Sequence, residues 1–353
     1  MTPQPGQPDQ PVQPGQPVQP GQPAQPSAEW QVSSGVAPQP AAAPVPGVAP
    51  QPPTRRAAAA AARRDRLGSA RLGFGGVLRS EWIKLWSVRS TWWTLSVLIV
   101  VGVGLALLVG LAIASVAGQT GTDSSGVTGL FESGDSDAQT AQMLQLAASG
   151  IGAAALVASV LGVLNITTEF SGGSITTSML AVPRRWPVLL AKALAVGIVL
   201  AVLGFVTMLL SAVVVSLLLH GVLPDQQPFS SQMLLVSLGA AAYLAALGII
   251  SVHIGAVVRS PAAGIAIVVG LLMIVPTVLS IVSGFDIDWA LTVNDWLPSQ
   301  AGTALTTMPM DAPAGMPAPE HPAMTAWQGG ISLAVWSVVS GAVAWLLTLR
   351  RDV

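Results

Sequence analysis

Six long apolar runs, none with a charged residue near its centre, dominate this 353-residue chain. About 20 consecutive apolar residues cross the hydrocarbon core of a bilayer as a helix, and a helix satisfies its own backbone hydrogen bonds there. Charged residues make up only 9% of the chain, against about 25% in soluble domains. The sequence therefore predicts an all-α integral membrane protein with six transmembrane helices. Within about three residues at each end, they are expected at 92–117, 146–165, 195–219, 232–257, 262–283 and 327–348.

Basic residues fall on alternate sides of these spans. All 15 lie before span one, between spans two and three, between four and five, or after six. The connections 118–145, 220–231 and 284–326 hold ten of the 16 acidic residues and no Lys or Arg. Cytoplasmic connections carry the excess of Lys and Arg in membrane proteins. We therefore expect a multi-pass protein of the cell membrane with both termini in the cytoplasm.

The chain divides into three parts by composition. Residues 1–54 repeat Gln-Pro-Gly-Gln-Pro units, which predicts a disordered cytoplasmic tail because too few apolar groups are present to build a core. Residues 55–90 form a basic juxtamembrane segment that ends in a helix, and residues 91–353 form the six-span domain.

The helix expected before span one is amphipathic. In VLRSEWIKLWSVRS, residues 77–90, one helical face carries Leu78, Trp82, Leu85 and Trp86. This pattern predicts a helix lying in the cytoplasmic interface with its tryptophans at headgroup depth. The alternative is a positively charged anchor for span one without an ordered interfacial position.

Several chemistries are missing from the sequence. The only lysines, Lys84 and Lys192, follow Ile83 and Ala191, so no Gly-Lys phosphate-binding loop exists. The three histidines lack metal-binding spacing, there is no cysteine, and no span has a charge at its midpoint to relay protons or ions. We therefore expect no enzymatic activity, no metal, no cofactor and no nucleic-acid partner, with any ATP hydrolysis in a separate subunit.

The connection between spans two and three, residues 166–192, is more than a simple tether. Ser171-Gly172-Gly173 can end span two, Ser174 can cap a short helix, and Pro183 can end it. Lys192 is expected to extend toward the headgroups as span three begins. A short helix held parallel to the membrane between two spans would let a soluble partner push both spans together.

The residues alone leave a second interpretation of this connection equally open. Arg184 and Arg185 can serve only to enforce the topology, and Glu169 can be a solvated helix end. The residues also leave the substrate open, because no polar group of residues is visible along any span.

Three motifs resemble the membrane subunits of type-2 ABC exporters, particularly the six-span permeases common in actinobacteria. They are SEWIKLWSVRSTWWTL before span one, TTEFSGGSITTSMLAVPRRWPVLLAKAL between spans two and three, and WLPSQAGTAL before span six. The resemblance covers roughly residues 77–353. It implies a permease that pairs with a second permease, identical or different, and with two separate ATP-binding cassette subunits.

The resemblance also implies roles for individual segments. The helix with Trp82, Leu85 and Trp86 is similar to the family's interfacial elbow helix, and the 169–180 segment to its coupling helix, which docks on the ATP-binding subunit. By this likeness the partner-coupling residues are Glu169, Phe170, Gly173 and Ile175, with Arg184 and Arg185 anchoring the return to the membrane. Many relatives carry a basic residue where this chain has Thr176. Segment 284–326 resembles the family's short external helices, or is an aromatic interfacial belt.

The expected function is therefore a permease that exports an apolar or amphipathic compound, in contact with membrane lipids and powered by a partner ATPase. One alternative is a scaffold or immunity-type membrane protein that binds partners and transports nothing. Another is a carrier coupled to a proton or sodium gradient, which the absence of charges at the span midpoints disfavours.

Overall fold

The computed structural model describes residues 55–56, 73–120, 136–172, 186–227, 229–285, 287–308 and 323–350. Internal contacts divide the chain into two units, Met1–Ser69 and Ala70–Val353. Only Arg55 and Arg56 of the first unit are described, so the predicted disordered tail at 1–54 lies outside the described residues and stays a prediction.

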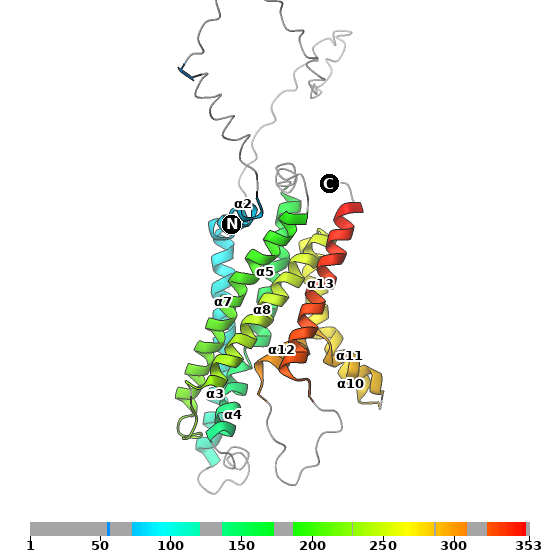
Figure 1. Cartoon of the computed structure of the whole chain (residues 1–353). Helices are drawn as coiled ribbons and strands as arrows, with labels where there is room; N and C mark the ends of the chain where they lie inside the picture. The colour runs from blue at the N-terminus through cyan, green and yellow to red at the C-terminus, as the bar shows by residue number, and fades with distance from the viewer. Residues whose placement is uncertain are drawn as a thin grey trace, which may run out of the picture. The chain divides into compact units, whose positions relative to one another are not determined.

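The second unit is a helical bundle (Figure 1). Its described residues form α2 Phe74–Ser87, α3 Arg89–Thr120, α4 Ser136–Ala148, α5 Ile151–Ser171, α7 Trp186–Leu219, α8 Ser231–Val258, α9 Pro261–Val269, η2 Gly270–Ile274, α10 Val275–Ser283, α11 Asp288–Asp295, α12 Pro298–Thr306 and α13 Ala326–Arg350. No strand occurs among them, which confirms the all-α prediction.

Six helical stretches among the described residues are long and apolar enough to cross a membrane, which confirms the predicted number of spans. They are Arg89–Ala117, Ser136–Ser171, Pro187–Leu219, Ser231–Val258, Pro261–Ser283 and Ala326–Arg350. Two of them begin well before the apolar runs do. Span two starts about ten residues earlier and span three about eight, because helix continues through polar and proline-containing segments that a hydropathy pattern leaves out.

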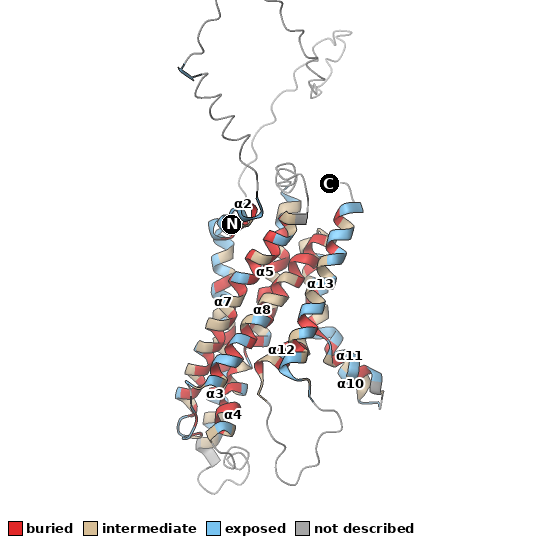
Figure 2. Ribbon diagram, in the orientation of Figure 1, coloured by how far each residue is buried: buried red, intermediate tan, exposed pale blue. Residues whose placement is uncertain are grey.

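The core lies where α5, α7 and α8 pack together, and Figure 2 shows buried residues concentrated there. The most apolar window of α8 is 67% buried inside the protein, against 17% for α13 and 22% for α3. Large apolar side chains therefore face outward on the peripheral helices, as expected for surfaces that meet lipid or another membrane subunit.

Small residues bring particular helices into close contact. A Cβ on Gly150, at the start of α5, would overlap the carbonyl of Gly102 in α3, and a Cβ on Gly239 in α8 would overlap the carbonyl of Leu305 in α12. Ala154 is fully buried on the same helix as Gly150. Small residues near the start of span two therefore let α3 and α5 approach closely. Gly152 is an exception, since no atom of the described residues would lie within 4 Å of its Cβ.

Part of the polar connection 118–145 is helical and packs against the bundle. Residues 136–145 belong to α4, where Gln139 and Thr140 are buried. Gln139 Oε1 accepts a hydrogen bond from the Asp225 backbone N–H at 3.0 Å, and Thr140 Oγ1 accepts one from the Gln227 N–H at 2.9 Å. Gln139 and Thr140 therefore hold the connection between α7 and α8 instead of facing water.

Span five contains a π-helical segment, η2, between α9 and α10. The Val275 N–H donates to the Gly270 carbonyl, five residues earlier. Pro276 follows directly, and because its ring cannot fit against the carbonyl four residues before it, the widened turn accommodates the proline. Beyond this span, α11 and α12 lie at the end of the bundle opposite α2 (Figure 1).

Candidate functional site

Helix α2 packs along the beginning of α7, and its buried face differs from the predicted stripe. Val77, Glu81 and Leu85 are its buried residues. Val77 contacts a cluster formed by Val188 and Ala191 of α7. Leu85 belongs to the predicted apolar face, whereas Glu81 lies outside that face and is nonetheless only 3% exposed. The face spaced every four residues from Val77 to Leu85 therefore turns inward.

The predicted tryptophans lie on the exposed side of α2. Trp82 and Trp86 are 38% and 37% exposed, and their rings lie 5.9 Å apart between centroids. The Trp86 ring also lies 4.9 Å from the Trp92 ring of α3, tilted by 56°, and the Trp92 indole N–H donates to the Trp86 carbonyl. Exposed indoles at the turn between α2 and the first span are typical of a membrane interface. The interfacial position of α2 remains a prediction.

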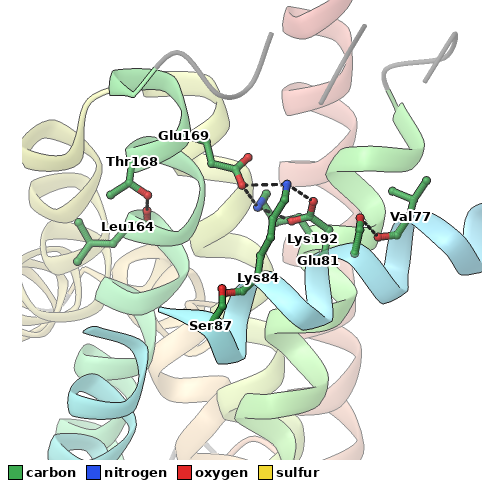
Figure 3. A network of polar contacts seen from close by, with 9 residues as sticks. Val77, Glu81, Lys84, Ser87, Leu164, Thr168, Glu169 and Lys192 are labelled. Atoms are coloured by element: carbon green, nitrogen blue, oxygen red, sulfur yellow. Dashed lines mark hydrogen bonds and ion pairs between the residues drawn. The ribbon is translucent and has the colours of Figure 1, made fainter. Parts of the chain in front are cut away.

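Four charged residues from α2, α5 and α7 come together where these helices meet (Figure 3). Lys192 Nζ of α7 lies 2.5 Å from Glu81 Oε2 and 2.9 Å from Glu169 Oε1 at the end of α5. Lys84 Nζ of α2 lies 2.7 Å from Glu81 Oε1 and 3.3 Å from the same Glu169 oxygen. We call these residues, Glu81, Lys84, Glu169 and Lys192, the ion-pair cluster.

Burial makes this arrangement electrostatically strong. Glu81 and Lys192 are each 3% exposed at the side chain, so neither charge could be tolerated there without its partner. Burial alone would raise the pKa of Glu81, but the charges and hydrogen bonds of Lys192 and Lys84 outweigh it and hold that pKa below its usual range. Burial likewise opposes the charge on Lys84, and hydrogen bonding and attraction to Glu81 and Glu169 nevertheless raise its pKa. The two carboxylates and two ammonium groups balance one another.

Phe170, the next residue after Glu169, contacts a different part of the bundle. The guanidinium carbon of Arg259 lies 5.0 Å from the centroid of its ring, a cation–π contact. Arg259 caps the C-terminus of α8 with a positive φ of 58°, the only such non-glycine residue in the described ranges. Its backbone N–H donates to the Gly255 carbonyl. The last turn of α5 is therefore tied to α2 and α7 through Glu169, and to the α8–α9 turn through Phe170.

The structure brings together only some of the residues predicted to act as a site. Glu169 and Phe170 flank the connection between α5 and α7, while Gly173, Ile175, Arg184 and Arg185 lie outside the described residues. The sequence interpretation missed Glu81 and misplaced Lys192, which is buried in ion pairs instead of extending toward headgroups. A signal was available: these are acidic and basic residues within apolar surroundings, which rarely remain unpaired.

A separate cavity of about 560 Å³ lies toward the opposite end of the bundle. Its wall combines apolar residues such as Leu105 and Leu272 with the polar side chains of Gln145, Ser149, Tyr243, Ser299, Thr303, Thr306 and Thr307. Part of the π-helical segment also lines it. The sequence shows no such polar group along any one span because these residues come from α4, α8, α12 and the turns beside them.

Comparison with protein-family models identifies one match, ABC-2 family transporter protein, over residues 77–353. A comparison with curated proteins gave no significant match. The matched region includes most of α2, all six candidate spans and the ion-pair cluster. Since it covers well over half of the sequence, the chain belongs to the ABC-2 transporter family, and it is a multi-pass permease component of the type-2 ABC class.

Proposed function

We propose that this chain is the permease of an ATP-driven exporter, paired with a second permease and powered by separate ATP-binding cassette subunits. The observation that carries the proposal is the ABC-2 family match across all six spans. The absence of a phosphate-binding loop supports a separate ATPase. The described basic residues Arg79, Arg259 and Arg350 come from segments at one end of the bundle, which supports a cytoplasmic location for that end and for both termini.

The ion-pair cluster supports a route for mechanical coupling. Residues 173–185 join α5 to α7, and both helices are tied to α2 at the ends nearest this connection. An ATPase that pushes on the connection would therefore move three helices together instead of bending one. In this proposal Glu169 and Phe170 transmit the movement, Gly173 and Ile175 meet the ATPase, and Arg184 and Arg185 anchor the connection to the membrane.

The proposed cargo is an amphipathic compound. The polar-lined cavity presents hydroxyl and amide groups beside leucine and isoleucine side chains, so it suits a molecule with both apolar and hydrogen-bonding parts. A substrate could move between two permeases and leave through this end. The external helices α11 and α12 lie beside the proposed exit, with α12 supplying Ser299 and Thr303 to the cavity wall.

The test is reconstitution of the full-length chain with candidate ATP-binding cassette subunits from the same organism. We expect the two proteins to copurify and the permease to stimulate ATP hydrolysis. Phe170→Ala should reduce this stimulation, since it removes the contact with Arg259 at the start of the coupling connection. Phe229→Ala is the matched control because Phe229 is 85% exposed and lies in the α7–α8 connection at the other end. Absence of any copurifying ATPase under mild detergent would favour the scaffold interpretation.

A further inference from the structure

A second polar cavity, of about 270 Å³, lies beside the ion-pair cluster. Its walls come from α2 and α3 around the turn between them, the C-terminal part of α5 from Leu161 onward and the start of α7. The polar lining residues are Lys84, Ser87, Ser90, Thr91, Thr94, Asn165, Thr168, Glu169 and Lys192. Leu85, Val88, Leu161 and Leu164 complete the wall. The cavity therefore has an apolar side and a strongly polar side.

Three hydroxyl groups of this cavity already donate their protons to backbone carbonyls, so toward an occupant they can only accept hydrogen bonds. Ser87 Oγ donates to the Lys84 carbonyl at 2.9 Å, Thr94 Oγ1 to the Ser90 carbonyl at 2.9 Å, and Thr168 Oγ1 to the Leu164 carbonyl at 2.7 Å. Each hydroxyl has one proton, and these protons are used within the protein's own helices. The oxygen lone pairs remain available to a molecule in the cavity.

Two further acceptors have no partner among the residues that the structure describes. Glu169 Oε2 and Asn165 Oδ1 are both buried and accept no hydrogen bond there. The other oxygen of Glu169 is already shared by Lys84 and Lys192. A buried oxygen without a donor costs free energy, so the cavity favours an occupant that brings several donors.

The cationic side chains at the cavity do not supply these donors. Lys192 Nζ is directed to Glu81 and to Glu169 Oε1, and Lys84 Nζ makes ion pairs with the same two residues. A primary ammonium group has three N–H donors and a positive charge, and it matches the free carboxylate oxygen of Glu169, the amide oxygen of Asn165 and the hydroxyl oxygens of the wall. The ammonium groups of Lys84 and Lys192 also line the cavity, and each is paired with carboxylates, so the occupant must carry an anion of its own to balance its charge.

The position of the cavity indicates the source of the ammonium group. It is lined by Ser87 and Val88 of the α2–α3 turn, next to Trp86, and exposed indoles such as Trp86 and Trp92 are typical of headgroup depth. Lys84 is 42% exposed, and Arg89 is exposed on the same turn, so a phosphate just outside the cavity would find cations there. We propose that this cavity binds the headgroup of phosphatidylethanolamine, with its ammonium inside and its phosphate at the rim.

The test compares headgroups by native mass spectrometry of the full-length protein, with thermal unfolding as a second readout. Phosphatidylcholine carries the same charge but has three methyl groups in place of the N–H donors. We expect at least a tenfold preference for phosphatidylethanolamine, equivalent to about 1.4 kcal/mol, and a larger rise in Tm with that lipid. Equal retention of the two lipids would overturn the proposal. Soluble phosphoethanolamine should not reproduce the effect; if it does, the site takes a free amine and not a lipid.

Two variants locate the binding site. Asn165→Leu removes one acceptor at similar side-chain size, and Thr94→Val removes another without touching the ion-pair cluster. Each should reduce the preference several-fold. The control is Thr277→Val in α10, whose hydroxyl also donates to its own helix, at 2.6 Å to the Met273 carbonyl, but which does not line the cavity. A preference retained in both cavity variants would contradict this location. The outcome does not depend on the ATPase, so failure here would leave the proposed function standing.

Discussion

Removing the charge of Lys192 should destabilise the protein more than any change at an exposed cation. Lys192→Met keeps an unbranched side chain but leaves Glu81, which is 3% exposed, with Lys84 as its remaining cation. Breaking a buried ion pair by deleting one partner costs about 3–5 kcal/mol. Because Lys84 still compensates part of the charge, we expect about 3 kcal/mol, which corresponds to a fall in Tm of roughly 6–12 °C by the scaling for domains of comparable size.

The assay is thermal unfolding of the purified full-length protein, followed by tryptophan fluorescence. Arg79→Met is the matched control because Arg79 lies on α2 but is exposed, and it should change stability by less than about 0.5 kcal/mol. The double variant Glu81→Leu/Lys192→Met should recover much of the loss, since no uncompensated charge is then buried at that position. The reasoning is refuted if Lys192→Met shifts Tm no more than Arg79→Met, or if the double variant shows the sum of the two single losses.

Two other predictions concern pH and helix packing. The pKa of Glu81 is lowered, so its contribution to the free energy of unfolding is complete above the ordinary pKa of 4.5 and is lost as pH falls below that value. The pKa of Lys84 is raised, so its contribution to the free energy of unfolding is complete below the ordinary pKa of 10.5 and is lost as pH rises above that value. The contribution of the cluster to Tm should therefore be constant between these limits and fall outside them, and a contribution confined to one narrow pH would argue against the cluster. Gly150→Ala should lower Tm by several degrees because its Cβ would overlap the Gly102 carbonyl, whereas Gly152→Ala, with open space around it, should be neutral or stabilising by up to about 1 kcal/mol. Similar Tm values for the two alanine variants would contradict the close helix crossing.

The spans were predictable because their signal is local. An apolar run long enough to cross a bilayer can be recognised from its own residues, without knowing what packs against it. The six predicted runs each lie within or nearly within a helix of the structure. The start of span two was missed for the opposite reason. Gln139 and Thr140 look like loop residues, and only their contacts with the α7–α8 connection, more than 80 positions away, explain why they are buried.

The ion-pair cluster shows the same limit at the candidate site. Glu81 and Lys192 are 111 positions apart, so the sequence could indicate that each needs a partner but not which residue that partner is. Taken singly, Glu81 belongs to the polar side of an amphipathic helix, and Lys192 resembles a residue that extends to the interface. The family resemblance indicated that the helix before span one and the connection after span two are important. It did not indicate that buried charges join them, because that depends on how α2 packs against α7.

The most direct test of the account asks whether the connection between α5 and α7 meets a cytoplasmic ATPase. The chain has no cysteine, so Thr176→Cys introduces a unique label within 173–185. We predict that a membrane-impermeant maleimide labels it in inside-out vesicles but not in intact cells, and that addition of the ATP-binding subunit protects it. Labelling from outside intact cells would contradict the account, since the connection would then face away from any ATPase.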